Sequence, residues 1–192
     1  MEISDLEAAI EGILFASGEP VAAERLALAL ALDLDTVNAI TTRLADYYSF
    51  QRRGIRLLKL DGSFQLCSSS EYSEPIQKAL ETRKPAKLSQ PALEVLSIIA
   101  YYQPVTRAYI DQIRGVDSAY TVGLLLDRKL IEECGKLAVP GRPILYRTTV
   151  DFLRTFGLSS LDALPELPNT KGAEHGQLKL LEELAPVSEE QL

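Results

Sequence analysis

The sequence has few of the residues from which catalytic and metal sites are built. It contains one histidine, His175, no tryptophan, and two cysteines, Cys67 and Cys134, outside any Cys-x-x-Cys spacing. His175 stands beside a glycine in a Pro- and Glu-containing stretch, a poor setting for a preorganised general base. Two isolated cysteines indicate reduced thiols and neither a zinc site nor a disulfide framework. We therefore predict no catalytic residues and no bound metal.

Nucleotide-binding and hydrolase motifs are also missing. The chain contains no Gly-x-Gly-x-x-Gly, no phosphate loop ending in Gly-Lys-Ser, and no Gly-x-Ser-x-Gly. The pair Gly135-Lys136 is followed by Leu137, which has no hydroxyl group. We expect a protein without a cofactor, and an enzyme is only the third of three hypotheses.

Charge and hydropathy restrict the partners. The 192 residues include 20 Lys and Arg against 27 Asp and Glu, and the net charge of -7 repels a polyanion at long range. No apolar run approaches the roughly 18 residues of a membrane-spanning helix, and the N-terminal residues lack the basic start of a signal peptide. We expect a cytoplasmic protein without a membrane partner, whose contact with DNA is confined to local basic patches.

Hydrophobic periodicity predicts a winged helix in the first part of the chain. Apolar residues recur at helical spacing over 3–14, 23–30 and 37–47, with Asp33 or Asp35 placed to cap the third helix. Three short helices in succession are therefore expected.

A β-hairpin follows these helices. The stretches 55–60 and 63–68 flank Asp61-Gly62, a dipeptide that supplies the positive φ angles of a two-residue turn. Three helices followed by a hairpin are typical of a winged-helix domain.

The pattern then repeats. Residues 81–87 contain a proline and no hydrophobic period, which indicates a linker. Ser89 is placed to cap the next helix, with Pro91 tolerated in its first turn. The buried stripe that we predict for this helix consists of Leu93, Leu96, Ile99 and Ala100.

Two further caps mark the next helices. Thr106 is placed to cap a helix that buries Tyr109, Ile110 and Ile113, and Gly115 ends it. Ser118 is placed to cap a third helix, which contains Val122, Leu125 and Leu126.

A second hairpin and a closing helix complete the repeat. A strand is predicted at 130–134, a wing tip at 140–143, and a helix around Phe152 and Phe156. The joints Glu19-Pro20-Val21 and Gln103-Pro104-Val105 occupy the same position in the two halves, which indicates an internal duplication.

The predicted fold class is mainly α with small β wings (α+β), built as two tandem winged-helix domains. The domains are expected at 1–80 and 88–165, joined by the linker 81–87. Residues 166–192 are rich in Glu and are expected to be an acidic, flexible, largely disordered tail.

A winged helix raises the question of DNA binding, because its third helix can enter the major groove. In the first domain the stretch 34–48 carries one basic residue, Arg43, against Asp35 and Asp46, and offers no row of donors for base edges. A DNA-binding or transcription-regulatory protein is therefore the alternative hypothesis. The basic residues that could contact DNA are Arg52, Arg53, Arg83, Lys84 and Lys87.

Aromatic residues favour a protein partner. Two small domains cannot bury all eight tyrosines, and tyrosine is enriched at protein interfaces. We expect a protein-binding role.

Several blocks of the sequence resemble the segregation and condensation protein B (ScpB) family. They span about residues 3–167 and comprise EGILF (11–15), SGEPV (17–21), LSQPALE (88–94), IIAYYQPVTR (98–107), IRGV (113–116) and PGRPILYRTT (140–149). The resemblance implies a non-catalytic tandem winged-helix protein that acts in chromosome segregation and condensation during cell division.

The resemblance also implies partners. It implies a homodimer formed through domain 1–80, and binding of the kleisin subunit ScpA by domain 88–165, alongside an SMC ATPase reached through the kleisin. DNA contact would be indirect or weak. The candidates for kleisin contact are Tyr101, Tyr102, Arg107, Arg114 and Arg142. Leu6 and Ile10 are candidates for the dimer face, with the core as their alternative place.

Overall fold

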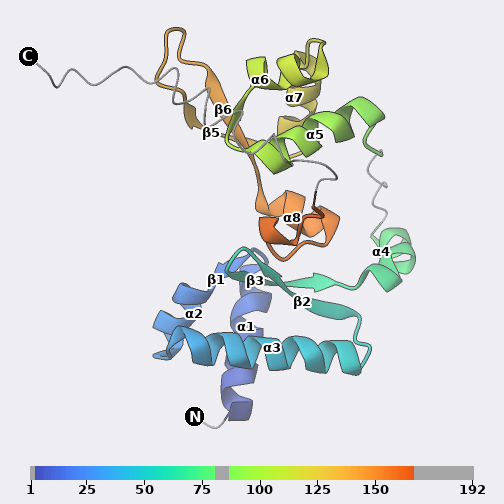
Figure 1. The fold of residues 1–192 in the computed structure, drawn as a ribbon. Coiled ribbons are helices and arrows are strands. Elements are labelled where there is room, and N and C mark those ends of the chain that lie inside the picture. Colours follow the sequence, from blue (N-terminus) through green and yellow to red (C-terminus); the bar gives the residue numbers. More distant parts are fainter. Residues whose placement is uncertain (1–2, 81–86, 167–192) are drawn as a thin grey trace, which may run out of the picture. The chain divides into compact units, whose positions relative to one another are not determined.

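The computed structural model describes residues 3–80 and 87–166. The chain divides into two compact units, Met1–Ala86 with Gly157–Leu161 and Lys87–Phe156 with Asp162–Leu192 (Figure 1). The linker residues 81–86, with Arg83 and Lys84, and the tail residues 167–192 lie outside the described residues.

Each unit contains the same succession of elements. The first has α1 (Ile3–Ser17), β1 (Val21–Ala22), α2 (Ala23–Leu30), α3 (Leu34–Phe50), β2 (Ile55–Leu60), β3 (Ser63–Ser68), η1 (Ser70–Tyr72) and α4 (Ser73–Ala79). The second has α5 (Gln90–Tyr102), β4 (Val105–Thr106), α6 (Arg107–Arg114), α7 (Ala119–Asp127), β5 (Ile131–Lys136), β6 (Ile144–Thr148) and α8 (Val150–Phe156), after which η2 (Leu161–Ala163) follows.

Both units are winged helices, as predicted. Their antiparallel sheets have the orders β1-β3-β2 and β4-β6-β5, so a short strand between the first two helices pairs with the second wing strand each time. The sequence analysis missed these two-residue strands and also α4. Val21 pairs with Phe64 and Val105 with Tyr146. Because the partner strands are distant in the sequence, these short strands have no local hydrophobic period from which they could be predicted.

Local chemistry sets the boundaries of the elements. Asp33 caps α3, since its carboxylate accepts hydrogen bonds from the backbone N and the Oγ1 of Thr36 at 2.7 Å each. These bonds lower the pKa of Asp33. Asp61 and Gly62 form the predicted turn with φ angles of 47° and 76°.

The core of the first unit differs from the predicted apolar period at one position. Tyr47, the last residue of the period predicted over 37–47, is half exposed, and its neighbour Tyr48 is buried instead. Burial and the nearby Glu11 carboxylate raise the pKa of Tyr48. Ile10 takes the second of its two expected places and is fully buried in the core, whereas Leu6 is partly buried against that core.

The core of the second unit contains Leu96, Ile99 and Ala100, as predicted, but not Leu93 or Ile113. Helix α5 buries Ala92, Val95, Leu96, Ile99 and Ala100. Leu93, expected in this stripe, has an exposed fraction of 37%, and Ile113, expected in the stripe of α6, has one of 46%. Successive helical residues differ in direction by about 100°, so a shift of one position turns Leu93 outward.

The cap of α6 gives a stability test. Thr106 is nearly buried and its Oγ1 accepts a hydrogen bond from the backbone N of Tyr109 at 3.3 Å. We expect Thr106→Val, which removes the acceptor and keeps the shape, to lower the free energy of unfolding by about 1 kcal/mol in urea titration. The control is Thr121→Val within α7, where no helix cap is lost. Equal stability of Thr106→Val and the wild type would contradict the role of this cap.

Candidate functional site

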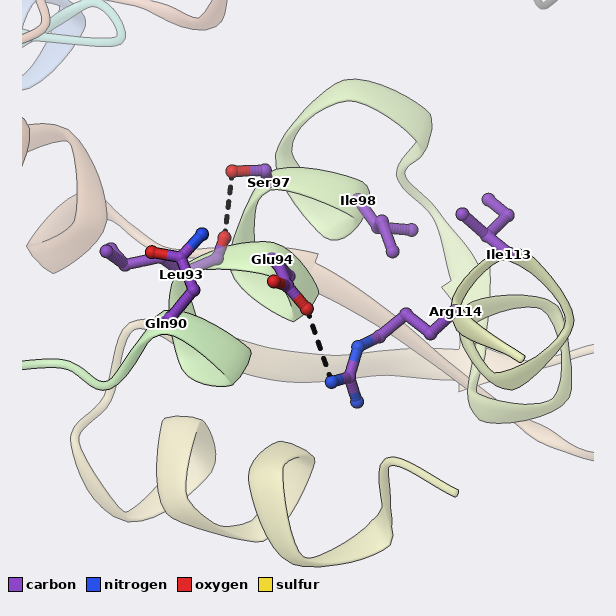
Figure 2. Close-up of a pocket in the computed structure, with 7 residues that line it drawn as sticks. All are labelled: Gln90, Leu93, Glu94, Ser97, Ile98, Ile113 and Arg114. Atoms are coloured by element: carbon purple, nitrogen blue, oxygen red, sulfur yellow. Dashed lines mark hydrogen bonds and ion pairs between the residues drawn. The ribbon is translucent and has the colours of Figure 1, made fainter. Parts of the chain in front are cut away.

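A groove on the second unit combines apolar and charged side chains. It lies between α5 and the C-terminal end of α6 and has a volume of about 440 Å³ (Figure 2). Its lining residues are Gln90, Leu93, Glu94, Ser97, Ile98, Ile113 and Arg114. Leu93 and Ile113 were both predicted to lie in the core. Together with Ile98 they supply the apolar part of the groove.

An ion pair joins the two helices across the groove. Arg114 Nη2 lies 3.4 Å from Glu94 Oε2, and the two side chains point toward one another from α6 and α5 (Figure 2). The exposed fraction of the side chain is 11% for Arg114 and 48% for Glu94. The guanidinium of Arg114 is thus nearly buried, while the carboxylate of Glu94 is half exposed to solvent.

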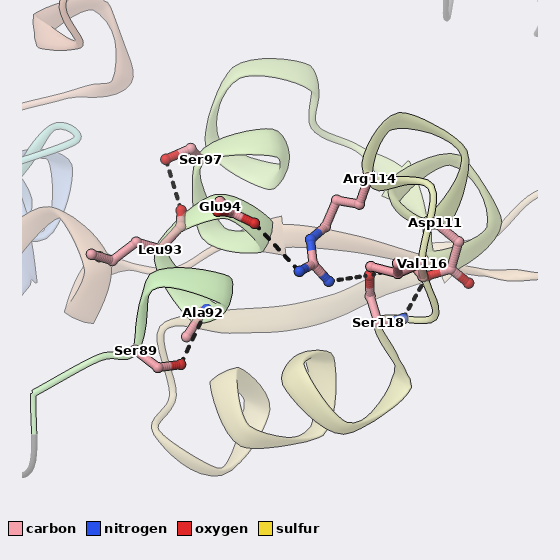
Figure 3. Close-up of polar contacts among 9 residues, drawn as sticks. All are labelled: Ser89, Ala92, Leu93, Glu94, Ser97, Asp111, Arg114, Val116 and Ser118. Atoms are coloured by element: carbon pink, nitrogen blue, oxygen red, sulfur yellow. Dashed lines mark hydrogen bonds and ion pairs between the residues drawn. The ribbon is translucent and has the colours of Figure 1, made fainter.

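The guanidinium also has a fixed partner below the groove. Arg114 Nη1 donates to Ser118 Oγ at 3.0 Å, and the backbone N of Ser118 donates to Asp111 Oδ1 at 2.7 Å (Figure 3). Ser118 precedes α7 as predicted, but its side chain makes no cap bond to that helix. Its hydroxyl instead accepts from Arg114, which the sequence pattern could not indicate.

One hydrogen-bond donor of this network is unused. The Nε of Arg114 is buried and has no hydrogen-bond partner within the described parts of the chain. A buried donor without an acceptor costs about 1–3 kcal/mol. The unit therefore holds a positive charge whose hydrogen-bonding capacity is not filled by the residues that the structure describes.

The predicted tyrosines lie at the end of α5. The Tyr101 hydroxyl donates to the carbonyl oxygen of Pro165 at 2.7 Å, so its polar end contacts the chain itself. The Tyr102 ring packs edge-on against Tyr109, with centroids 6.0 Å apart. Burial raises the pKa of Tyr109. By helical spacing Tyr101 follows Glu94 on the same side of α5, seven residues further along the helix.

The two other predicted contact residues lie outside the groove. Arg107 begins α6, where its Nε lies 3.7 Å from Asp111 Oδ2. Arg142 stands exposed at the wing tip between β5 and β6, with a φ of 42°. Of the five candidates for kleisin contact, only Arg114 lines the groove.

The sequence analysis missed the other groove residues. Gln90, Glu94, Ser97 and Ile98 were not singled out, although they follow helical spacing on α5. The signal that could have found them is that α5 is apolar on more than one side, with Leu93 and Ile98 outside the stripe that fills the core.

The third helix of each unit, α3 or α7, is the one that would enter the major groove of DNA, and both have few basic side chains. The one basic residue of α3, Arg43, forms an ion pair with Glu7 at 2.6 Å. Helix α7 has no basic residue, and its most exposed large side chain is Tyr120. Neither helix presents the Arg, Lys, Asn or Gln rows that recognise base edges.

The basic DNA-contact candidates that the structure describes are exposed. Arg52 and Arg53 follow the end of α3, and Lys87 begins the second unit.

Within residues 3–80 and 87–166, no helix is long and apolar enough to cross a membrane. Those same ranges contain no group of three or more His, Cys, Asp or Glu side chains that could hold a metal.

Comparison with known proteins places this fold in context. Residues 8–167 match the family described as segregation and condensation complex subunit ScpB. A segregation and condensation protein B from Lachnoclostridium phytofermentans is 47% identical over 174 residues, which cover 91% of this chain and 92% of the relative. One from Ruminiclostridium cellulolyticum is 46% identical over 167 residues, covering 87% and 88%. The crystal structure of ScpB from Mycobacterium tuberculosis is 31% identical, covers 82% of this chain and 98% of that one, and has a TM-score of 0.41.

Proposed function

Because the chain belongs to the ScpB family of segregation and condensation complex subunits, we propose that it is a non-catalytic subunit of a bacterial SMC condensin-like complex. In this proposal it binds the kleisin subunit ScpA and acts in chromosome segregation and condensation during cell division. The SMC ATPase is its indirect partner, reached through the kleisin.

The α5–α6 groove is the observation that carries this proposal. Partly exposed Leu93 and Ile113 stand beside the Arg114–Glu94 ion pair, a mixture suited to side chains of another protein. Segments of another protein dock in grooves that combine apolar pockets with a few polar anchors. The C-terminal unit is therefore the kleisin-binding domain in this proposal.

The alternative, a DNA-binding or transcription-regulatory winged helix, has one supporting feature. Arg52, Arg53 and Lys87 are exposed and could contact phosphates. The net charge of -7 and the acidic and apolar character of the two reading helices oppose sequence-specific binding. DNA contact is therefore weak or indirect in the proposed function.

The two functions are separated by measuring two bindings side by side. We expect the full chain to bind the purified kleisin of its own organism with an affinity that changes little between low and physiological salt. Random duplex DNA should bind weakly, because few phosphates would be neutralised. Isothermal titration calorimetry and fluorescence anisotropy provide the two readouts. Strong, steeply salt-dependent DNA binding without kleisin binding would reject the proposal in favour of the alternative.

Self-association is the second part of the proposed function, and the first unit supplies a surface for it. With Ile10 in the core, the outer side of α1 presents Ala8, Gly12, Phe15 and Ala16 at helical spacing. Phe15 has an exposed fraction of 82%, and no atom lies within 4 Å of where a Cβ of Gly12 would stand. We assign this surface to a second copy of the chain, since small residues allow close approach of two helices.

A charge at Gly12 tests the dimer face. We expect Gly12→Glu to convert the dimer to a monomer in light scattering coupled to size-exclusion chromatography, because a partner helix would bury the carboxylate. The monomer should remain folded, with the helical circular dichroism of the wild type, since glutamate favours a helix more than glycine does and meets no neighbour there. Ala39→Glu on the exposed side of α3 is the control and should remain dimeric. A dimer that persists in Gly12→Glu would place the interface elsewhere.

A further inference from the structure

The chemistry of the α5–α6 groove specifies what segment of the kleisin it accepts. We propose that the occupant is an amphipathic helix whose Asp or Glu, flanked by aliphatic residues one turn away, replaces Glu94 as the partner of Arg114. This inference rests on the proposed function, because it names the chemistry of the segment that the kleisin-binding domain recognises.

The backbone of the occupant needs hydrogen-bond partners when it enters the groove. An extended segment that docks on a protein commonly satisfies its backbone groups by pairing with the edge of a sheet. The groove is lined by side chains of two helices, α5 and α6, and contains no strand edge. A helix satisfies its own backbone hydrogen bonds and needs only side-chain contacts, so it suits this groove.

Arg114, the buried end of the ion pair, has hydrogen-bond donors that are not all used. Arg114 is almost fully covered, one of its amino groups is committed to Ser118, and its Nε has no acceptor within the described residues. A guanidinium has five donor hydrogens in a planar fork, which matches a carboxylate that approaches with both oxygens. The unfilled capacity of Arg114 therefore selects a negatively charged group.

Glu94 is the exposed end of the ion pair. Glu94 is half exposed and its oxygen lies 3.4 Å from Nη2, longer than the roughly 2.7–2.9 Å of a well-formed charge-assisted hydrogen bond. Glu94 therefore holds Arg114 loosely in the free chain and competes with an incoming carboxylate. A partner acid that brings aliphatic neighbours would displace it, because Leu93 and Ile113 become covered at the same time.

The second unit also contains a matched control pair. Arg147 Nε lies 2.7 Å from Glu132 Oε1 across the two wing strands, with exposed fractions of 58% and 47%. This pair has the same chemistry as Arg114–Glu94 and lies outside the groove. Replacing Arg147 or Glu132 by glutamine changes the net charge of the unit by the same amount as replacing Arg114 or Glu94. It leaves the groove residues unchanged.

The experiment measures the affinity of the full chain for the purified kleisin of the same organism by isothermal titration calorimetry. Arg114→Gln is expected to weaken binding by about 10- to 100-fold, because the partner carboxylate loses its counter-charge. Glu94→Gln is expected to strengthen binding severalfold, because it removes the competing carboxylate and leaves the groove open. Arg147→Gln and Glu132→Gln should bind as the wild type does.

Arg114 also donates a hydrogen bond to Ser118, so thermal melts check the stability of Arg114→Gln. If that variant is unstable, the affinity of Glu94→Gln tests the proposal. Weaker or unchanged binding by Glu94→Gln would overturn the proposed exchange of carboxylates. Equal losses in Arg114→Gln and Arg147→Gln would also overturn it, by assigning the effect to net charge. Kleisin binding by the wild type with no effect of the groove variants rejects this inference alone, whereas no binding by the wild type rejects the proposed function too.

Discussion

The small core of each unit can bury only one side of its first helix. Both first helices, α1 and α5, are apolar on more than one side, so apolar side chains remain exposed on each. In α5 the core takes Val95, Leu96 and Ile99, which leaves Leu93 facing outward beside Glu94. In α1 the core takes Ile10 and Leu14, which leaves Phe15 exposed. The surplus apolar surface of these first helices is what a protein partner can cover. The duplicated fold thus presents corresponding helices to the two proposed partners, a second copy and the kleisin.

This arrangement changes how a winged helix is used. In a DNA-binding member of the fold, the third helix and the wing face the nucleic acid. Here α7 places Val122 and Leu125 in the core and carries no basic residue, and the only arginine of α3 is paired with Glu7. The first and second helices instead frame the groove around Arg114. The same scaffold can therefore present a groove for protein binding when its third helix lacks the basic residues that bind DNA.

The predictable features of the fold were those that depend on residues close in sequence. The Asp61-Gly62 turn, the Thr106 cap and the left-handed Gly115 that ends α6 follow from local backbone chemistry. The N-terminal edge of the buried stripe in α5 did not, because Ala92 and Leu93 are both apolar and tertiary packing decides which one is buried. The groove was missed for the same reason, since its floor depends on contacts of Arg114 with residues on other elements.

Methyl NMR of isoleucine-labelled protein tests most directly whether this groove is where the kleisin binds. Ile98 and Ile113 line the groove, whereas Ile131 is buried at the start of β5 and lies outside the groove lining. On addition of the kleisin, the methyl resonances of Ile98 and Ile113 should shift or broaden, and that of Ile131 should change little. Unchanged Ile98 and Ile113 resonances in a saturated complex would contradict the assignment of the groove and place the kleisin on another surface.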